Sequence, residues 1–146
     1  MKITLLLFTL LFGMMLKAQI VPFYSTIYDK YGYIDEKGQV IVEPKYDLAY
    51  NLNEGMAAFR INGKYGYIDQ KGHEIISPKY DHTWKFIGGY AAVGLAEKYG
   101  FVDKAGKEVI PLIYEDANNF HGTCCYKGEA HVKQNGKWKI IKIAEQ

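Results

Sequence analysis

The most reactive side chains of the sequence lie together in the segment HGTCCYKG, residues 121–128. Cys124 and Cys125 are the only two cysteines, and adjacent thiols can form a disulfide, exchange with another thiol or bind a soft metal. A disulfide between sequence neighbours closes a small, strained ring that is easily reduced. Three interpretations therefore stay open: two reduced thiols in a loop, a strained disulfide that senses redox state or a ligand, and disulfide bonds to another chain.

His121 adds an imidazole to these thiols, but three candidate ligands within one loop indicate a metal site only weakly. The other histidines, His73, His82 and His131, have no partners at ligand spacing. We predict no metal site. We interpret the Cys-bearing segment first as a non-catalytic loop, because most loop insertions are merely tolerated.

Three aspartates recur at a fixed spacing, each three residues before a glycine: Asp35, Asp69 and Asp103. Repeated carboxylates suggest acid–base chemistry or Ca²⁺ binding, but one Asp and one Gly per turn fall well short of a calcium loop. A type I turn explains both residue types. An active site is a single asymmetric arrangement, whereas these residues come in copies, and the sequence has no phosphate loop, HExxH or nucleophile elbow. The sequence therefore predicts no catalytic residues, no cofactor and no enzyme activity.

Aromatic residues recur with the same spacing. Four of them form the ladder Tyr31, Tyr65, Tyr99 and Trp138. A second aromatic follows two residues later in three units: Tyr33, Tyr67 and Phe101. One interpretation is a row of flat surfaces that stack on sugar rings or grip an extended polymer. The other is a core between repeats, in which each tyrosine hydroxyl finds a partner at the edge. Repetition favours the core, because every interface of a repeat array must be filled alike.

The spacing comes from an internal repeat. KYGYIDEKGQVIVEPKYD (30–47) and KYGYIDQKGHEIISPKYD (64–81) share thirteen of eighteen residues at an offset of 34. KYGFVDKAGKEVIPLIYE (98–115) follows after another 34 residues, and KWKIIK (137–142) after 39, so the Cys-bearing segment carries five additional residues. A period of this size indicates a tandem supersecondary unit. We place the units at about residues 22–53, 54–87, 88–126 and 127–146, the last of them partial.

Each unit is expected to form three antiparallel strands. In the second unit these are MAAFRI, KYGYI and HEII, at residues 56–61, 64–68 and 73–76. Asn62-Gly63 joins the first two and is the strongest short hairpin signal, while Pro78 is expected to end the third. One such meander cannot bury enough apolar area alone, so neighbouring units must stack. The predicted fold is all-β, with tandem three-stranded antiparallel meanders in an open, twisted array; a closed, propeller-like ring is the alternative.

The unit NGKYGYIDQKGHEIISPKYD, residues 62–81, followed by a Gly-Ala strand, resembles the bacterial WG (KWG-type) repeat. The resemblance covers about residues 22–143. Three units carry Tyr in place of the name-giving Trp, and the fourth keeps Trp138 but has Lys139 in place of the glycine. The resemblance implies a non-enzymatic interaction module, often found on exported bacterial proteins, with poorly defined partners and no reaction.

Residues 1–18 have the pattern of a secretory signal peptide. Lys2 precedes a fourteen-residue apolar stretch, and Ala18 is a small residue at the expected cut before Gln19. An uncleaved anchor or a cut nearby is the alternative. Fourteen residues would rise only about 21 Å as a helix, short of a bilayer core of about 30 Å. Removal of this leader leaves sixteen basic and sixteen acidic residues, and a neutral chain disfavours nucleic-acid and anionic-membrane partners.

We therefore predict that residues 19–146 form an exported, non-enzymatic repeat module in the periplasm, on the cell surface or secreted. Its expected role is protein–protein interaction or scaffolding in the cell envelope, without membrane insertion after the leader is removed. The alternative is binding of cell-wall or other envelope polysaccharide through the aromatic ladder. A redox-active thiol protein is a third hypothesis. The candidate binding residues are Tyr31, Tyr65, Tyr99, Trp138, His121, Cys124 and Cys125.

Overall fold

The computed structural model describes residues 19–118 and 128–143, and its regular elements there are all β-strands. The first seven strands are β1 (Val21–Ser25), β2 (Lys30–Ile34), β3 (Val40–Tyr46), β4 (Leu48–Ala49), β5 (Met56–Ile61), β6 (Lys64–Asp69) and β7 (Glu74–Tyr80). The next seven are β8 (His82–Thr83), β9 (Tyr90–Leu95), β10 (Lys98–Asp103), β11 (Glu108–Tyr114), β12 (Asp116–Asn118), β13 (Glu129–Gln134) and β14 (Lys137–Lys142). None of the described segments is a helix long and apolar enough to cross a membrane.

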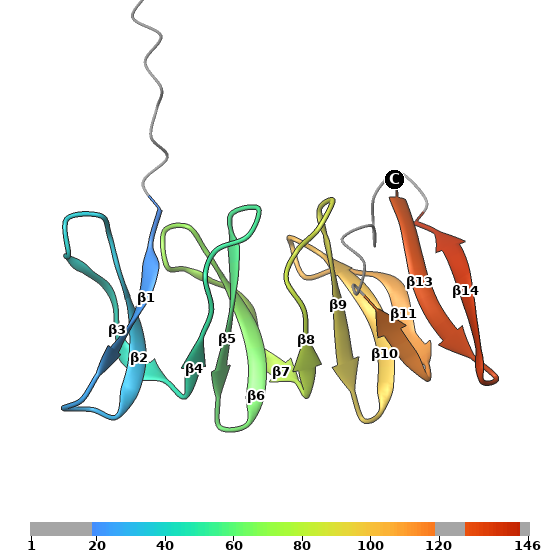
Figure 1. The fold of residues 1–146 in the computed structure, drawn as a ribbon, viewed down its shortest axis with the longest axis horizontal. Helices are drawn as coiled ribbons and strands as arrows, with labels where there is room; N and C mark the ends of the chain where they lie inside the picture. Colours follow the sequence, from blue (N-terminus) through green and yellow to red (C-terminus); the bar gives the residue numbers. More distant parts are fainter. Residues whose placement is uncertain (1–18, 119–127, 144–146) are drawn as a thin grey trace, which may run out of the picture.

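The strands form four antiparallel sheets that follow one another in a row along the molecule (Figure 1). In order, they contain β1-β2-β3, then β4 to β7, then β8 to β11, and finally β12-β13-β14. The prediction of an open, all-β array of repeated antiparallel units is confirmed, and the described sheets do not close into a ring. Each predicted meander is present, and in the second and third sheets the connection from the preceding unit adds a short fourth strand.

Local turn chemistry follows the sequence prediction. The Asp69 Oδ1 atom accepts hydrogen bonds from the amides of Lys71 and His73 at 2.8 and 2.9 Å. Gly72 closes the turn with φ +83°, a left-handed conformation that glycine adopts without a Cβ penalty. Asp35 and Asp103 accept the same pair of amides in their own turns. These carboxylates are therefore turn-forming groups.

A second acid of each repeat ties neighbouring units together. The Asp81 carboxylate accepts a hydrogen bond from Lys64 of its own unit and another from the amide of Ala96, in the hairpin turn of the next unit. Asp47 makes the equivalent contacts with Lys30 and the amide of Asn62. The acid after each third strand thus caps the next hairpin, which explains why Lys and Tyr-Asp recur together.

The core lies between the sheets and is filled by the inner aromatic positions. Tyr33, Tyr67 and Phe101 have no exposed surface, and each faces the following sheet. The Tyr33 hydroxyl donates to the backbone oxygen of Tyr50 at 2.9 Å, and the Tyr67 hydroxyl donates to that of Trp84 at 2.6 Å. At these three positions the core interpretation is therefore confirmed, and both tyrosine hydroxyls find a partner, in the connection that leads into the next sheet.

The third strand of each unit differs from the prediction, because proline does not end it. β7 continues through Pro78 to Tyr80, and its pairing with β6 jumps from Tyr67↔Ile76 to Tyr65↔Tyr80. The additional residues bulge opposite Gly66, and a bulge is where a sheet tolerates a proline that cannot donate a ladder hydrogen bond. The strand is therefore longer than its apolar part.

This bulge explains the glycine of the repeat. A Cβ atom at Gly66 would lie closer than 3.0 Å to the backbone oxygen of Ile76 and 2.7 Å from Phe59 Cζ. Gly32 and Gly100 face the same kind of close backbone approach. In the last sheet no described strand follows β14, and Lys139 occupies the equivalent position, with its Nζ atom 5.3 Å from the ring centroid of Tyr114. The lysine therefore departs from the repeat pattern in the sheet for which no bulged strand is described.

Candidate functional site: the pocket between the second and third sheets

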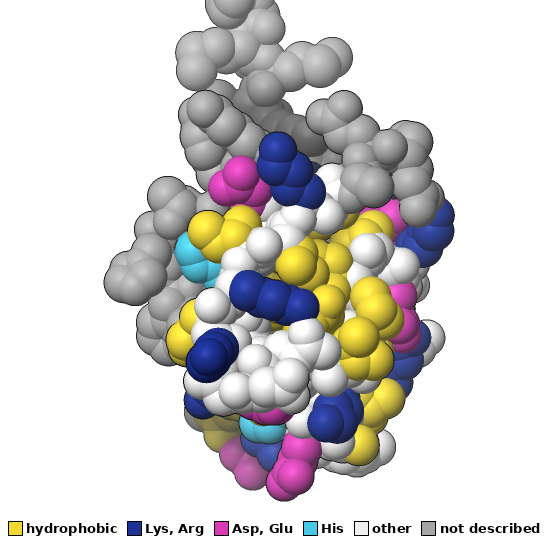
Figure 2. Space-filling view, turned by 90° about the vertical axis from the view of Figure 1, so that its right-hand side faces the viewer, with side chains coloured by type: hydrophobic (Ala, Val, Ile, Leu, Met, Phe, Trp, Pro, Cys, Tyr) yellow, Lys and Arg dark blue, Asp and Glu magenta, His cyan; other side chains and the backbone are white. Residues whose placement is uncertain are grey.

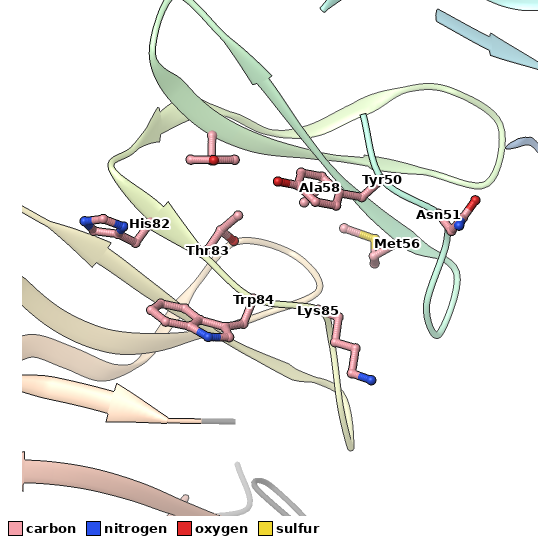
Figure 3. A pocket seen from close by; sticks show the side chains of 9 residues that line it. Tyr50, Asn51, Met56, Ala58, His82, Thr83, Trp84 and Lys85 are labelled. Carbon is pink, nitrogen blue, oxygen red and sulfur yellow. The ribbon is translucent and has the colours of Figure 1, made fainter. Parts of the chain in front are cut away.

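An open pocket of about 600 Å³ lies between the second and third sheets. Its lining residues are Tyr50, Asn51, Met56, Ala58, Tyr65, His82, Thr83, Trp84 and Lys85. Tyr50 and Trp84 stand on opposite sides of the space, with Ala58 and Met56 on the β5 side (Figure 3). Ala58 contributes only a methyl group to the lining, so its side chain fills little of the space between the two aromatic rings.

The two walls are equivalent parts of successive repeats. Tyr50 directly follows the short strand β4, and Trp84 directly follows β8. The backbone amide of Tyr50 donates to Ala58 at 3.0 Å, and that of Trp84 donates to Ala92 at 3.1 Å. Together with the Tyr33 and Tyr67 hydroxyl bonds described above, these contacts fix both walls from two sides. The buried tyrosines of the repeat therefore position the pocket rather than line it.

A loop contact holds the two sheets at one separation. The Glu54 carboxylate accepts hydrogen bonds from the amides of Gly88 and Gly89 at 2.7 and 2.9 Å. Lys104 donates to the Glu54 backbone oxygen at 2.8 Å, which adds a third bond between the same sheets. Because these bonds cross from the second sheet to the third, they limit how far the pocket can open or close.

The chemistry of the pocket is that of flat apolar walls with a polar rim. Burial, followed by hydrogen bonding to Tyr65, raises the pKa of the Tyr50 hydroxyl, so it stays neutral. His82 stacks on Tyr99 with ring centroids 5.9 Å apart, and its ring borders the pocket. Asn51 and Lys85 add an amide and a cation to the lining. This arrangement suits a flat or apolar group that carries polar substituents.

The carboxylates near the site are engaged in structural contacts. The hydrogen bond from Lys64 is the main reason that the pKa of Asp81 is lowered, and Lys30 acts in the same way on the pKa of Asp47. A general acid or base works best when its pKa lies near the operating pH. Carboxyl groups with lowered pKa values stay ionised at neutral pH and are poor candidates for that role.

The ladder residues predicted from sequence are not one continuous surface. Tyr31, Tyr65 and Tyr99 are half-buried, and each packs against the core between its own sheet and the next. Only Tyr65 of the four lines the pocket, while Trp138 is 49% exposed at the end of the last sheet. The remaining candidates, His121, Cys124 and Cys125, lie outside the described residues.

Sequence reasoning missed the pocket walls, although a signal for them exists. Tyr50 and Trp84 are both aromatic and both stand four residues after the tyrosine of the Tyr-Asp pair, in YDLAY (46–50) and YDHTW (80–84). They were missed because the pocket forms only when one repeat stacks on the next.

The family model described as "WG containing repeat" matches residues 31–65, 65–99 and 99–138. The chain belongs to the WG repeat family. Within this WG repeat protein, each matched segment begins at an outer ladder position, and the third is longer because it contains the additional residues around the two cysteines. No curated protein matches the chain.

A solved structure titled "Crystal structure of the eukaryotic initiation factor" is similar to the WG repeat protein in fold. The two are 11% identical with a TM-score of 0.50, and the match covers 86% of this chain. It covers 37% of the solved chain, so the WG repeat protein spans well under half of that length. At this identity the likeness concerns the arrangement of the strands alone.

The ionisable groups of the WG repeat protein predict a stability optimum near neutral pH. Lys30, Lys64 and Lys45 lower the pKa of Asp47, Asp81 and Glu74, and the amide of Gly136 lowers that of Glu115. Because these folded-state pKa values lie below the unfolded ones of about 4, their stabilisation is present above pH about 4 and is lost as the pH falls.

The alkaline limit comes from the buried phenols. Burial raises the pKa of Tyr33, Tyr46 and Tyr67, so their stabilisation is present below the unfolded value of about 10 and decreases above it. Urea unfolding at about pH 3, 7 and 11 should therefore give the highest midpoint at pH 7. Equal midpoints at all three pH values would show that neither set of groups contributes.

Proposed function

We propose that this WG repeat protein is an exported, non-enzymatic binding module that holds a segment of a partner protein in the pocket between its second and third sheets. The observation that carries the proposal is the placement of Tyr50 and Trp84 on opposite sides of an open pocket of about 600 Å³. Tyrosine and tryptophan are the residues that most often dominate binding energy at protein interfaces. An apolar or aromatic side chain of the partner would insert between the two rings.

A non-catalytic role is supported by how the acidic groups are used. Asp35, Asp69 and Asp103 accept turn amides, and Asp47 and Asp81 cap hairpins of the next unit. The described residues contain no group of three or more His, Cys, Asp or Glu side chains placed to hold a metal ion. The pocket itself presents aromatic rings and methyl groups, which favour binding over bond making.

A protein segment is favoured over a long polymer by the exposure of the ladder. A platform for an extended glycan needs a row of exposed rings, one for each repeat, whereas Tyr31, Tyr65 and Tyr99 are half-buried. Among the residues that the structure describes, Tyr50 and Trp84 form a pair of flat walls in the pocket between the second and third sheets. One contact between two rings, with polar groups around it, matches one inserted side chain better than it matches many equivalent sugar rings.

The proposal can be tested by photo-crosslinking in cells. A photoreactive amino acid at Asn51, which is exposed at the pocket, should yield a discrete crosslinked protein. The same probe at Ile113, which is 53% exposed and lies outside the pocket lining, should not. A crosslinking pattern that is identical at both positions would contradict the proposal.

Affinity for the captured partner then tests the aromatic wall. Trp84→Ala should weaken binding about tenfold or more, because loss of an aromatic anchor commonly costs about 2 kcal/mol or more. Trp138→Ala removes the other tryptophan from an exposed position far from the pocket and should leave the affinity unchanged. Circular dichroism checks that both variants are folded. If the two variants weakened binding of the partner equally, the pocket would not be the binding site.

Envelope polysaccharide is the second candidate, because a sugar ring can also stack between Tyr50 and Trp84. The two candidates separate in a pelleting assay with insoluble peptidoglycan and exported polysaccharide. Saturable pelleting that Trp84→Ala abolishes would favour the glycan. Absence of pelleting, together with a protein crosslink at Asn51, would favour the protein partner. Cell fractionation and the mass of the purified chain test export and removal of residues 1–18.

A further inference from the structure

The outer face of the first sheet is an unusual surface for the end of a repeat array. Val21 and Val40 both pair with Ile34 across neighbouring strands, so the three side chains share one face, and Phe23 lies two residues after Val21 on that face. Val21 is 41% exposed and Val40 is 47% exposed. Terminal repeats usually carry a polar outer face, and this one is apolar.

The same positions in the second sheet are interior. Ala57, Phe59 and Ile68 correspond to Val21, Phe23 and Ile34 in the strand registers, and their exposed fractions are 1%, 0% and 0%. They are buried because this face packs on the first sheet, where the Phe59 ring stacks on Tyr46 with centroids 4.3 Å apart. The outer face of the first sheet therefore has the residues of a sheet–sheet interface without a described sheet against it.

The other end of the row offers the opposite half of that interface. Trp138 and Ile140 occupy the positions of Tyr65 and Tyr67, and they are 49% and 57% exposed, whereas Tyr67 is fully buried against the third sheet. Figure 2 looks onto this end and shows hydrophobic side chains near its centre, with Lys side chains across and beside them. In every earlier sheet this face is covered by the next one.

We propose that two copies of the chain associate head to tail, with the outer face of the first sheet of one copy packed on the outer face of the last sheet of another. The interface would continue the three sheet–sheet interfaces already present within the chain. It is independent of the ligand pocket, because neither end face contributes a lining residue.

The interface would be weaker than the internal ones, for two reasons. No strand is described after β14, so the described part of the last sheet contains no counterparts of Val42 and Tyr46, which complete the first interface. His131 and Lys133 pair with Ile140 and Trp138, so polar groups share the face. Association should therefore depend on concentration. Because the contact joins two different surfaces, it can propagate to further copies.

Sedimentation analysis of protein purified from cells that express the full chain tests this proposal. The weight-average mass should rise with concentration. Val21→Glu blocks one end and Trp138→Glu blocks the other, and each should raise the dissociation constant about tenfold or more. Both replaced side chains are exposed, so the fold should tolerate the change, which circular dichroism checks. Ile113→Glu places the same charge on a middle sheet and should have no effect.

Mixing the two end variants gives the decisive result. Each variant keeps one intact end, so an equimolar mixture should associate again but stop at dimers. A monomer at every concentration would overturn the proposal. So would a mixture that fails to associate. Loss of association through Val21→Glu alone, with Trp138→Glu unaffected, would indicate a face-to-face dimer of first sheets and would also overturn the proposal. Association that survives both substitutions would place the contact elsewhere and would also overturn it.

Discussion

Gly66→Ala should lower the free energy of unfolding by about 3 kcal/mol or more, because the added methyl group would overlap with backbone atoms of the neighbouring strand. The added Cβ atom would meet the Ile76 backbone oxygen, the Phe59 ring and the nitrogen of Pro78, each within 3.0 Å. Two of these three contacts are with the main chain of the bulge in β7, which cannot move aside as a flexible side chain can. Since small domains are stable by only about 5–15 kcal/mol, the variant should be close to unfolding.

The fourth unit supplies a matched control. Lys139 occupies the position of Gly66 in a sheet where no bulged strand is described, so Lys139→Ala should change stability by about 1 kcal/mol or less. Urea unfolding followed by circular dichroism measures both variants. If Gly66→Ala and Lys139→Ala lower the free energy of unfolding equally, the close approach of β7 is not the reason that the repeat has a glycine at this position.

Tyr67→Ala should lower the free energy of unfolding by about 3–5 kcal/mol, because it leaves a cavity between two sheets. Tyr67 is fully buried, and its ring packs edge-on against Phe86 with centroids 4.9 Å apart. Its hydroxyl also bonds Thr83 and the Trp84 backbone oxygen, so the variant should loosen β8 and one wall of the pocket.

Tyr67→Phe separates the ring from the hydroxyl. The third unit already has Phe101 at this position, so the ring alone should support the interface, and the loss should be about 1 kcal/mol. Trp138→Ala, at the exposed end of the array, should cost less than Tyr67→Ala by several fold. Thermal unfolding of the three variants orders them. Similar losses for Tyr67→Ala and Trp138→Ala would contradict a core built from the inner aromatic positions.

The features predicted well from sequence are those that depend on a few adjacent residues. Asn62 and Gly63 both have positive φ, of 50° and 77°, as their hairpin requires. The turn at Asp69 depends only on a carboxylate reaching amides two and four residues ahead. Such contacts recur wherever the residues recur, so the repeat spacing is sufficient to place the first two strands of each unit and the turns that follow them.

Features that depend on the neighbouring unit were predicted poorly. Tyr65 and Tyr67 lie on one strand face two residues apart, yet only Tyr67 is fully buried, because the adjoining sheet covers one and leaves the other at the pocket. The role of Gly66 depends on a bulge that begins ten residues later in the chain. The expected strand end at Pro78 is wrong for the same reason, because only the bulge lets β7 continue through a proline.

The candidate site also depends on the neighbouring unit, which is why the sequence did not predict it. Ladder residues were selected because they repeat, and repetition mainly marks the interfaces that every unit must fill. Tyr50 and Trp84 differ in residue type and follow short strands that no pattern of alternation indicates. The pocket arises from the pair, one from each unit, above the small Ala58 side chain.

The most direct test of the pocket is the fluorescence of Trp84. The chain has two tryptophans, so a Trp138→Phe background leaves Trp84 as the sole tryptophan. Titration with the partner captured through Asn51 should shift Trp84 emission to shorter wavelength and protect it from acrylamide quenching, because the inserted group removes the ring from water. An unchanged Trp84 spectrum and unchanged quenching at saturating partner would show that binding leaves the pocket open, which would contradict the proposed binding site.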